Sequence, residues 1–336
     1  MMPGSKGLKP HEPAHRWLKD PGAYLTPTSL YNDVGINEKK RCSKYDSAWR
    51  SGHNNRRKGM LEMIKIILLV VVICAVAYAL MIMPRMTGRP DTSLFEKKLF
   101  AHRGLHDNKT DAPENSMEAF RKAIDAGFGI EFDVHVTKDG IPVVFHDFKL
   151  DRVCGREGII EKHTYEELQQ YHLCDSAEKI PALRDVLALV DGNVPLIVEI
   201  KSESTDLSSC EVIDGMLREY KGAYCIESFN PLVLWWYRCH HKEVVRGQLS
   251  SNFAKDGNFR GPLYFVIQHL LLNFLAKPDF IAYNHKFYKE TGRRLCHGLY
   301  RLPAAAWTIR SQQELDAMQG HFEVFIFDSF WPKREK

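Results

Sequence analysis

The sequence predicts a closed (β/α)₈ TIM barrel preceded by a single transmembrane helix. Short apolar segments alternate with helical segments from Leu99 onward, and a run of eighteen apolar residues lies upstream of them. Alternating strands and helices favour parallel β-α-β units, and eight such strands within about 235 residues fit a closed barrel. An open doubly wound sheet is the alternative architecture.

The predicted strands are runs of six or seven residues rich in apolar and β-branched side chains, which favour extended structure. They cover 99–104, 129–134, 195–201, 223–229, 244–249, 279–284, 304–309 and 324–329. The clearest helical segments between them cover 116–126, 183–190, 231–239 and 312–319. Only the turn Asp139-Gly140 separates segment 141–147 from the second strand, which is too little chain for a parallel crossover. This segment is therefore predicted to be the returning arm of a hairpin.

The segment 66–83 reads IILLVVVICAVAYALMIM and contains no charged residue. At 1.5 Å per residue it spans roughly 27 Å, close to the hydrocarbon thickness of a bilayer. We therefore expect a transmembrane helix over 63–83 that contacts the lipid bilayer through residues 66–83. A buried core helix rarely lacks a polar face for so long, and no small-residue cleavage site follows as it would in a signal peptide.

The flanking segments complete the predicted domain organisation. Residues 1–62 lack sustained periodicity and are basic, with twelve Lys/Arg against five Asp/Glu in the first sixty positions, so a disordered tail is expected. Residues 84–97 are predicted to be a linker and residues 98–336 the barrel. Cations are denser before the helix than after it, which favours a cytoplasmic N-terminus and an extracytoplasmic barrel. Met60 is an alternative start of the chain.

Composition excludes several other classes. After the first sixty residues the charge is nearly balanced, with 34 Lys/Arg against 37 Asp/Glu, which argues against nucleic acid as a partner. The eight cysteines form no C-x-x-C pair, no zinc-site spacing and no recognisable disulfide framework.

Ionisable residues gather in the predicted hairpin. Glu131 and Asp133 are two residues apart on one strand, so their side chains share one side. A two-residue turn at Asp139-Gly140 would place Asp133 directly opposite His146. The hairpin is therefore predicted to bring His146 to the two carboxylates.

The ends of other strands supply further groups, because the C-terminal strand ends of a barrel converge on one face. The residues predicted to meet there are three carboxylates, two imidazoles and two cations: Glu131, Asp133, Glu199, His102, His146, Arg103 and Lys201. Three clustered carboxylates would repel one another without a cation, so we expect a divalent metal, Mg²⁺ or Ca²⁺, among them. Imidazoles beside a metal suit acid–base catalysis, and the cations suit a phosphate, so the group as a whole suits phosphodiester cleavage.

Each of these residues has a simpler interpretation when it is taken singly. A histidine at a strand end is more often a satisfied polar residue than a catalyst. Glu199 and Lys201 alone could be a surface ion pair, and Glu131 and Asp133 an exposed strand face. The joint interpretation is stronger because groups from several strands fall on one face of the barrel.

Several motifs support the joint interpretation. They are "HRG" at 102–104, "PENS" at 113–116, "EFDVHVTKDGIPVVFHD" at 131–147, "IP" at 180–181, "VEIK" at 198–201, "SF" at 228–229 and "WT" at 307–308. In order and spacing these motifs resemble those of the glycerophosphodiester phosphodiesterases. The resemblance covers residues 99–330.

The resemblance implies a barrel enzyme that hydrolyses glycerophosphodiesters to glycerol 3-phosphate and an alcohol. A substrate hydroxyl would attack phosphorus, and the cyclic phosphate would then be hydrolysed. By position, the acid–base pair is His102 and His146, the metal ligands are Glu131, Asp133 and Glu199, and the substrate contacts are Arg103, Lys201, Glu114 and Trp307.

Departures from the family pattern leave alternatives open. The family often closes its last strand with Thr-Asp-x-Pro, whereas this chain has Phe-Asp-Ser-Phe at 327–330. The apolar stretch 261–276 fits either a core-facing helix or a helix that contacts membrane or an acyl chain. Alternative functions are a lysophospholipase D that acts on lysophospholipids and a catalytically silent, membrane-bound binding module.

Overall fold

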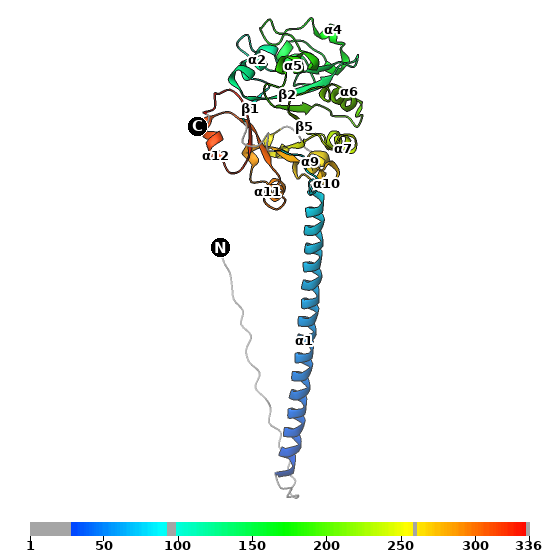
Figure 1. The fold of residues 1–336 in the computed structure, drawn as a ribbon. Coiled ribbons are helices and arrows are strands. Elements are labelled where there is room, and N and C mark those ends of the chain that lie inside the picture. Colours follow the sequence, from blue (N-terminus) through cyan, green and yellow to red (C-terminus); the bar gives the residue numbers. More distant parts are fainter. Residues whose placement is uncertain (1–27, 93–98, 258–260, 334–336) are drawn as a thin grey trace, which may run out of the picture. The chain divides into compact units, whose positions relative to one another are not determined.

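The computed structural model describes residues 28–92, 99–257 and 261–333. The chain divides into two compact units, Met1–Val72 and Ile73–Lys336. The first unit contains most of helix α1, and the second contains the last turns of α1 and the barrel (Figure 1).

Helix α1 (Thr28–Met81) is continuous over 54 residues. No proline interrupts it, and Pro84 prevents it from continuing far beyond Met81. It begins inside the region predicted to be an irregular tail, and residues 1–27 of that region lie outside the described part of the chain. The section Arg41–Met81 is long and apolar enough to cross a membrane.

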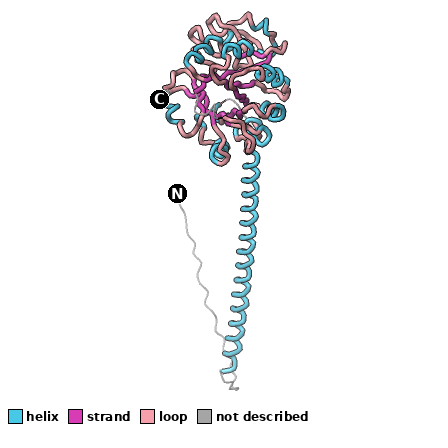
Figure 2. The backbone as a smooth tube through the Cα atoms, in the orientation of Figure 1, coloured by secondary structure: helices cyan, strands magenta, loops and turns pink. Residues whose placement is uncertain are grey.

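Eight parallel strands close into a barrel, and Figure 2 shows them gathered among the surrounding helices. The order around the barrel is β1, β2, β4, β5, β6, β7, β8 and β9, and β9 pairs with β1 to close it. The strands are β1 (Leu99–His102), β2 (Gly129–Val136), β4 (Leu196–Ile200), β5 (Tyr224–Ser228), β6 (Arg246–Ser250), β7 (Phe280–Asn284), β8 (Ala304–Ile309) and β9 (Val324–Phe327). The predicted fold class is thereby confirmed.

Helices follow the strands, as the alternating pattern predicted. The longer ones are α2 (Met117–Ala126), α5 (Leu183–Val190), α6 (Ser208–Leu217), α7 (Pro231–His240), α11 (Thr291–Gly298) and α12 (Gln312–Met318). Shorter helical turns are α8 (Phe253–Asp256), α9 (Pro262–Gln268), α10 (Asn273–Ala276) and the 3₁₀ turn η2 (His285–Phe287). The predicted linker 84–97 is described only as far as residue 92.

The first strand ends two residues earlier than predicted. Arg103 and Gly104 both adopt positive φ angles, 56° and 82°, so the chain turns sharply after His102. A side chain at Gly104 would also meet Ala119 of α2 at 2.9 Å. Glycine is therefore required here both by its backbone conformation and by the close approach of α2.

The segment 137–182 leaves the barrel between β2 and α5, and we call it the excursion. It contains β3 (Pro142–Val144), α3 (Asp151–Cys154), η1 (Ile160–Lys162) and α4 (Tyr165–Leu168). Val144 belongs to the main core, whereas eight other buried apolar residues form a cluster separate from the barrel core: Val143, Phe145, Leu150, Val153, Ile160, Leu168, Leu173 and Ile180. The excursion therefore has a small core of its own.

The predicted hairpin register is wrong by one residue. Val134 pairs with Val144, and the Phe145 amide donates a hydrogen bond of 3.0 Å to the Asp133 carbonyl, so Asp133 faces Phe145 rather than His146. The Gly140 amide donates to the Thr137 carbonyl at 3.0 Å, which closes a three-residue loop over 138–140. A three-residue loop with glycine in the left-handed region shifts the pairing from that of a two-residue turn.

Inside the barrel, one layer of side chains is apolar and the next is polar. The apolar layer consists of Phe100, Ile197, Cys225, Val245, Leu249, Phe280, Ala282, Ala305, Val324 and Ile326. Side chains in a strand alternate between its two faces, so the residue two positions later points into the barrel again, closer to the C-terminal end. Those positions carry the candidate site.

An ion pair is buried near the N-terminal ends of β6 and β7. Arg246 and Asp279 are both almost fully buried, and the Arg246 Nη1 lies 3.8 Å from Asp279 Oδ2. The Arg246 amide also donates to that oxygen at 3.2 Å, and Arg85 Nη1 lies 3.5 Å from the other oxygen. Asp279 thus balances two guanidinium groups.

We expect Asp279→Ala to lower the free energy of unfolding by about 3–5 kcal/mol, because Arg246 would remain buried without its partner. Urea unfolding of the full chain in detergent, followed by circular dichroism, measures this change. Asp185→Ala is the control, since its ion pair with Arg184 is exposed and should contribute at most about 1 kcal/mol. Equal effects of the two substitutions would contradict the assignment.

Candidate active site

The inward-facing positions near the C-terminal strand ends are polar on most strands. They are His102 on β1, Glu131 and Asp133 on β2, Glu199 on β4, Glu227 on β5, Asn284 on β7, Trp307 on β8 and Asp328 just after β9. The barrel therefore places its ionisable groups in one layer above an apolar floor.

The three predicted metal ligands lie together. Asp133 pairs with Glu199 in the β2–β4 register, and Glu131 lies two residues before Asp133. One carboxylate oxygen from each residue lies within 4.8 Å of the other two, and all three residues are buried. The sequence prediction that these carboxylates converge agrees with this geometry.

Two cations contact the carboxylate group. Lys201 Nζ lies 2.8 Å from Asp133 Oδ1 and 2.7 Å from Glu199 Oε1, so the ammonium bridges two strands. Arg103 approaches from the β1 loop, with Nε 3.6 Å from Asp133 Oδ2, and its amide donates to Glu131 Oε2 at 3.1 Å.

The pKa values of the carboxylates diverge because these cations are unevenly shared. Burial and the neighbouring charges of Asp133, Glu227 and Glu199 raise the pKa of Glu131 well above its usual value. Burial also raises the pKa of Glu199, to about 7, although Lys201 opposes this shift. Burial would raise the pKa of Asp133 as well, but Lys201, His146 and Arg103 together lower it well below the usual range.

Glu227 is a fourth carboxylate of this layer, and it belongs to none of the motifs that the sequence predicted to form the site. It lies opposite Glu199 in the β4–β5 register and is almost fully buried. Burial, Glu199 and Asp133 raise its pKa, and its Oε2 accepts no hydrogen bond from the residues that the structure describes. Its position two residues after the buried Cys225 was a usable signal, since the same spacing separates Ile197 from Glu199.

The charges of this layer are suited to a divalent cation. Four buried carboxylates face two cationic side chains, Lys201 and Arg103, in the described part of the chain. The deficit of positive charge and the unsatisfied Glu227 oxygen both fit a hard ion with oxygen ligands. Glu131, Asp133 and Glu199 could therefore hold a divalent metal.

His102 lies at the end of β1 between two carboxylates. Its Nε2 is 4.0 Å from Glu131 Oε2, and its Nδ1 is 3.8 Å from Asp328 Oδ2. Burial, and next the charge of Arg103, lower the pKa of His102 to about 4. The ring is therefore neutral near pH 7 and can accept a proton.

His146 reaches the carboxylates from the excursion, just after β3. Its Nδ1 lies 2.5 Å from Asp147 Oδ1, and Arg152 Nε donates to the other Asp147 oxygen at 2.7 Å. Burial, followed by Lys201, lowers the pKa of His146. The predicted approach of His146 to Asp133 thus occurs through a loop and not through strand pairing.

Glu114 joins the barrel to the excursion. It accepts a hydrogen bond from Arg103 Nη1 at 2.7 Å, two from Arg152 at 2.6 and 2.7 Å, and one from Asn108 Nδ2 at 2.8 Å. The next residue, Asn115, donates from Nδ2 to Asp133 Oδ2 at 2.9 Å.

Trp307 stands apart from the other predicted residues. Its ring meets Phe229 edge-on at 5.7 Å, and its carbonyl lies 3.2 Å from His285 Nδ1. The indole Nε1 is buried and has no hydrogen-bond partner among the described residues.

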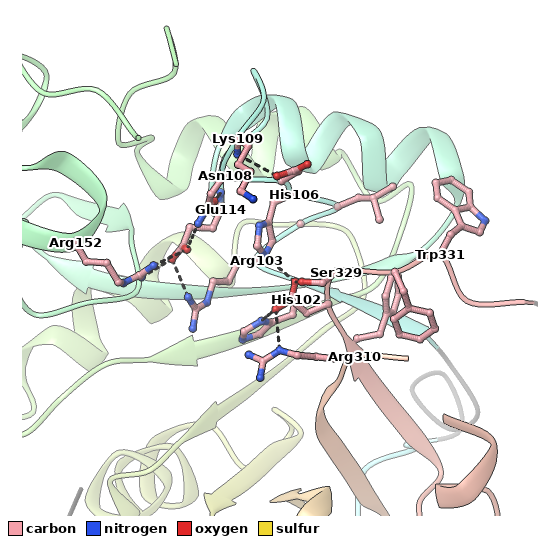
Figure 3. Close-up of a pocket in the computed structure, with 16 residues that line it drawn as sticks. His102, Arg103, His106, Asn108, Lys109, Glu114, Arg152, Arg310, Ser329 and Trp331 are labelled. Carbon is pink, nitrogen blue, oxygen red and sulfur yellow. Dashed lines mark hydrogen bonds and ion pairs between the residues drawn. The ribbon is translucent and has the colours of Figure 1, made fainter. Parts of the chain in front are cut away.

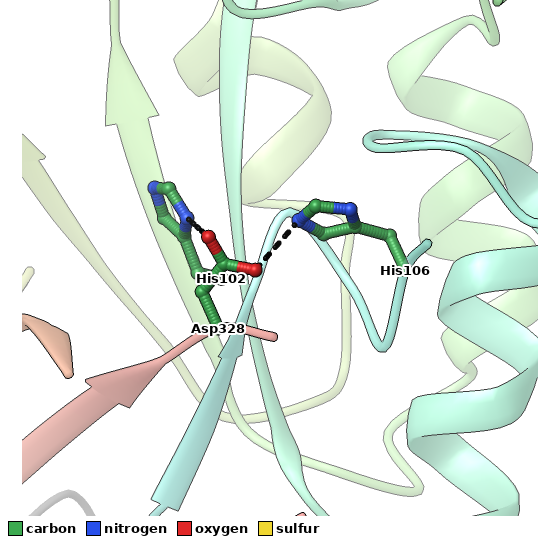
Figure 4. A group of neighbouring side chains, drawn as sticks. All are labelled: His102, His106 and Asp328. Carbon is green, nitrogen blue, oxygen red and sulfur yellow. Dashed lines mark ion pairs between the residues drawn. The ribbon is translucent and has the colours of Figure 1, made fainter. Parts of the chain in front are cut away.

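A cavity of about 660 Å³ opens beside His102 (Figure 3). Its walls combine cationic side chains, including Lys109, Arg152 and Arg310, with Phe327 and Phe330. In Figure 4 Asp328 lies between two imidazoles, 3.8 Å from His102 and 3.3 Å from His106. His106 and Arg310 were not predicted site residues, because His106 lies in the loop after β1 and Arg310, directly after β8, belongs to no motif that pointed to the site.

A barrel with imidazoles and clustered carboxylates at its C-terminal strand ends defines an enzyme of the (β/α)₈ class. Residues 102–319 match the Glycerophosphoryl diester phosphodiesterase family, and the chain belongs to that family. The family, fold and enzyme class predicted from the sequence are thereby confirmed.

Known proteins agree with this assignment. The chain is 30% identical to human Glycerophosphodiester phosphodiesterase 1 over 269 residues, which cover 68% of this chain and 77% of that protein. It is 40% identical to a Glycerophosphodiester phosphodiesterase of Bacillus altitudinis over 115 residues, but this match spans only 32% of this chain and 46% of that protein. The fold is similar to that of an Oleispira antarctica phosphodiesterase in complex with the product sn-glycerol-3-phosphate, with a TM-score of 0.56 and 21% identity over 69% of this chain and 93% of that one.

The Glu114 cluster should make stability depend on pH. Burial alone would raise the pKa of Glu114, but hydrogen bonds from Arg152 and the charge of Arg103 lower it from 4.5 to about 2. Its stabilising contribution is therefore present above the unfolded-state pKa and is lost as the pH falls through the folded-state pKa.

We expect the stability difference between the parent and Glu114→Gln to shrink by roughly 3 kcal/mol as the pH falls from 5 to 2. Urea unfolding at each pH measures it, and Glu203→Gln, on an exposed loop, is the control. A difference that stays constant with pH would mean that the Glu114 ion pairs do not stabilise the fold.

Proposed function

We propose that this chain is a membrane-anchored, metal-dependent phosphodiesterase that hydrolyses glycerophosphodiesters to glycerol 3-phosphate and an alcohol. The observation that carries the proposal is the carboxylate group flanked by His102 and His146 at the C-terminal end of the barrel. Family membership supports the reaction, and the product held by the Oleispira antarctica neighbour supports glycerol 3-phosphate as one half of the substrate.

In this proposal Glu131, Asp133 and Glu199 hold a divalent ion, Mg²⁺ or Ca²⁺. When bound, the ion would polarise a phosphoryl oxygen and balance the buried negative charge. Arg103 and Lys201 already lie against the carboxylates and would contribute further positive charge toward the phosphate. Glu114 holds Arg103 in place, and the unpartnered Nε1 of Trp307 would donate to substrate.

The two histidines divide the proton transfers. One accepts the proton of the substrate hydroxyl that attacks phosphorus, and the other donates a proton to the alcohol oxygen that leaves when its bond to phosphorus breaks. Water then hydrolyses the resulting cyclic phosphate to glycerol 3-phosphate, with the two imidazoles exchanging roles. Because Asp147 holds His146 through Nδ1, the Nε2 atom of that ring remains for chemistry. His102 belongs to the barrel and His146 to the excursion, so the two rings approach the phosphate from different elements.

Removal of metal should abolish hydrolysis, because no ion would then polarise the phosphoryl oxygen. We expect excess chelator to eliminate release of glycerol 3-phosphate from glycerophosphocholine, and added Mg²⁺ or Ca²⁺ to restore it. Full turnover in excess chelator would contradict the metal site.

His102→Ala and His146→Ala should each lower turnover by about 10²- to 10⁴-fold, the usual contribution of a general acid or base. Both variants should still bind metal in calorimetric titrations, whereas Asp133→Ala should not. His163→Ala is the matched control, because that ring bonds a carbonyl within the excursion. Near-normal turnover of either variant would exclude that ring from the chemistry.

A lysophospholipase D is the second candidate, because Phe327 and Phe330 give the cavity an apolar wall. The cationic and imidazole groups on the remaining walls favour a water-soluble alcohol group over an acyl chain. Turnover of glycerophosphocholine, glycerophosphoethanolamine, glycerophosphoglycerol and lysophosphatidylcholine by the purified chain compares the two candidates. Release of phosphate ester from none of them would support the silent binding module instead.

We further propose that the end of α1, from residue 63 to Met81, spans the bilayer once, with the barrel outside the cytoplasm. The predicted contact with lipid up to residue 83 is too long, because Ile82 is buried in the hydrophobic core of the barrel unit. The section Arg41–Met81 fits such a span, and the cations that precede residue 66 favour this orientation. Protease added to intact cells should digest the barrel, whereas a cytoplasmic control protein should survive. Cleavage of the barrel only after lysis would reverse the orientation.

A further inference from the structure

Four apolar side chains are exposed on one part of the second unit, at α9, α10 and the end of α11. Leu263, Phe265, Phe274 and Leu299 each expose between 44% and 60% of their surface, and we call them the apolar face. Helix α9 has no buried residue. The stretch 261–276 therefore divides: α9 is exposed, whereas Leu270 and Ala276 belong to the main hydrophobic core.

The last turns of α1 are fixed beside the apolar face. Tyr300 Oη donates a hydrogen bond of 2.7 Å to the Ala79 carbonyl, and Asn273 Nδ2 donates one of 3.2 Å to the Ile82 carbonyl. Ile82 is fully buried in the main hydrophobic core. Each of the two donors is the sequence neighbour of a residue of the apolar face, Leu299 or Phe274, so that part of the face lies next to the last turns of α1.

The position of these contacts along α1 determines how far the apolar face can lie from the membrane. The apolar run continues to Met83, yet contact with Tyr300 already occurs at Ala79. Four residues of helix correspond to about 6 Å, and the headgroup layer on one side of a bilayer is roughly 5–8 Å thick. If the apolar run spans the membrane, the apolar face must lie within or against the layer of lipid headgroups.

Cations border the apolar face. Arg238 Nη1 donates to the Leu275 carbonyl at 2.7 Å, and Lys277 Nζ donates to the Met83 carbonyl at 3.2 Å. Arg301 is exposed at the end of the loop that follows α11. Long basic side chains beside exposed apolar groups are typical of surfaces that lie at the interface of a membrane with anionic lipids.

We infer that the apolar face is a membrane-docking surface, whose partner is the headgroup and outer acyl layer of a bilayer that contains anionic lipid. The inference rests on the proposed membrane span but not on the proposed reaction. Leu263, Phe265, Phe274 and Leu299 enter the lipid, and the bordering cations meet lipid phosphates. The barrel is then held against the membrane surface.

The docking surface and the cavity use different parts of the barrel unit. The cavity is lined by residues from β1, the loop that follows it, α3 and the ends of β8 and β9, and none of the residues that line it belongs to α9, α10 or α11. Docking therefore leaves the cavity free to receive substrate from water.

Photocrosslinking tests this inference in the full chain reconstituted in nanodiscs of phosphatidylcholine and phosphatidylglycerol. The photoreactive residue p-benzoylphenylalanine replaces Phe265, Leu299, Ile73 or Trp331, one position at a time. Ile73 lies in the apolar run and reports insertion, whereas Trp331 is an exposed aromatic residue that lines the cavity. Mass spectrometry after illumination measures the yield of lipid adducts.

We expect lipid adducts at positions 265 and 299 at yields comparable to position 73 and several-fold above position 331. Yields at 265 and 299 equal to that at 331, beside a strong adduct at 73, would overturn the docking surface while retaining the span. An adduct to a second copy of the chain would assign the face to a dimer instead. The absence of a lipid adduct at position 73 would contradict both the membrane span and the docking surface. Turnover does not enter the readout, so none of these outcomes bears on the hydrolytic proposal.

Discussion

The contact between Asp133 and Lys201 holds the candidate site together. Asp133 is fully buried, and its carboxylate meets the Lys201 ammonium at 2.8 Å, while Asn115 donates to its other oxygen at 2.9 Å. Lys201 in turn reaches Glu199 on β4. One buried carboxylate therefore fixes the relative positions of β2, the end of β4 and the loop before α2. The charged form of Asp133 tolerates burial because its carboxylate is paired with Lys201 and hydrogen-bonded to Asn115.

Much of the fold and site could be predicted because a barrel strand has a simple period. On several strands an inward-facing apolar residue belongs to the floor of the barrel. The residue two positions later points to the same side and is an ionisable residue of the candidate site. This rule leads from Phe100 to His102 and from Ile197 to Glu199. The same rule leads from Cys225 to Glu227 on β5. Glu227 was not predicted because it lies in none of the motifs that pointed to the site.

Other features depended on information that a local pattern does not contain. The sequence Asp139-Gly140 fits loops of two or three residues, and the choice depends on contacts outside the turn, such as the hydrogen bond from the Tyr165 amide to Asp139 Oδ1. His106 and Arg310 enter the cavity from loops, whose paths no periodicity predicts. The helical start of α1 at Thr28 was not predicted because the residues between Thr28 and the apolar run show no sustained apolar periodicity.

The two histidines of the candidate site are held by different hydrophobic cores. His102 belongs to a strand inside the large barrel core, whereas His146 is carried by a segment whose own core consists of eight buried apolar side chains. Fewer buried contacts mean a smaller free energy of local opening. We therefore expect the excursion to open more readily than the barrel, and at the site the hydrogen bonds from Arg152 to Glu114 oppose this opening. The distance between the imidazoles of His102 and His146 therefore depends on how the excursion packs, and substitutions in its core, far from the phosphate, would change it.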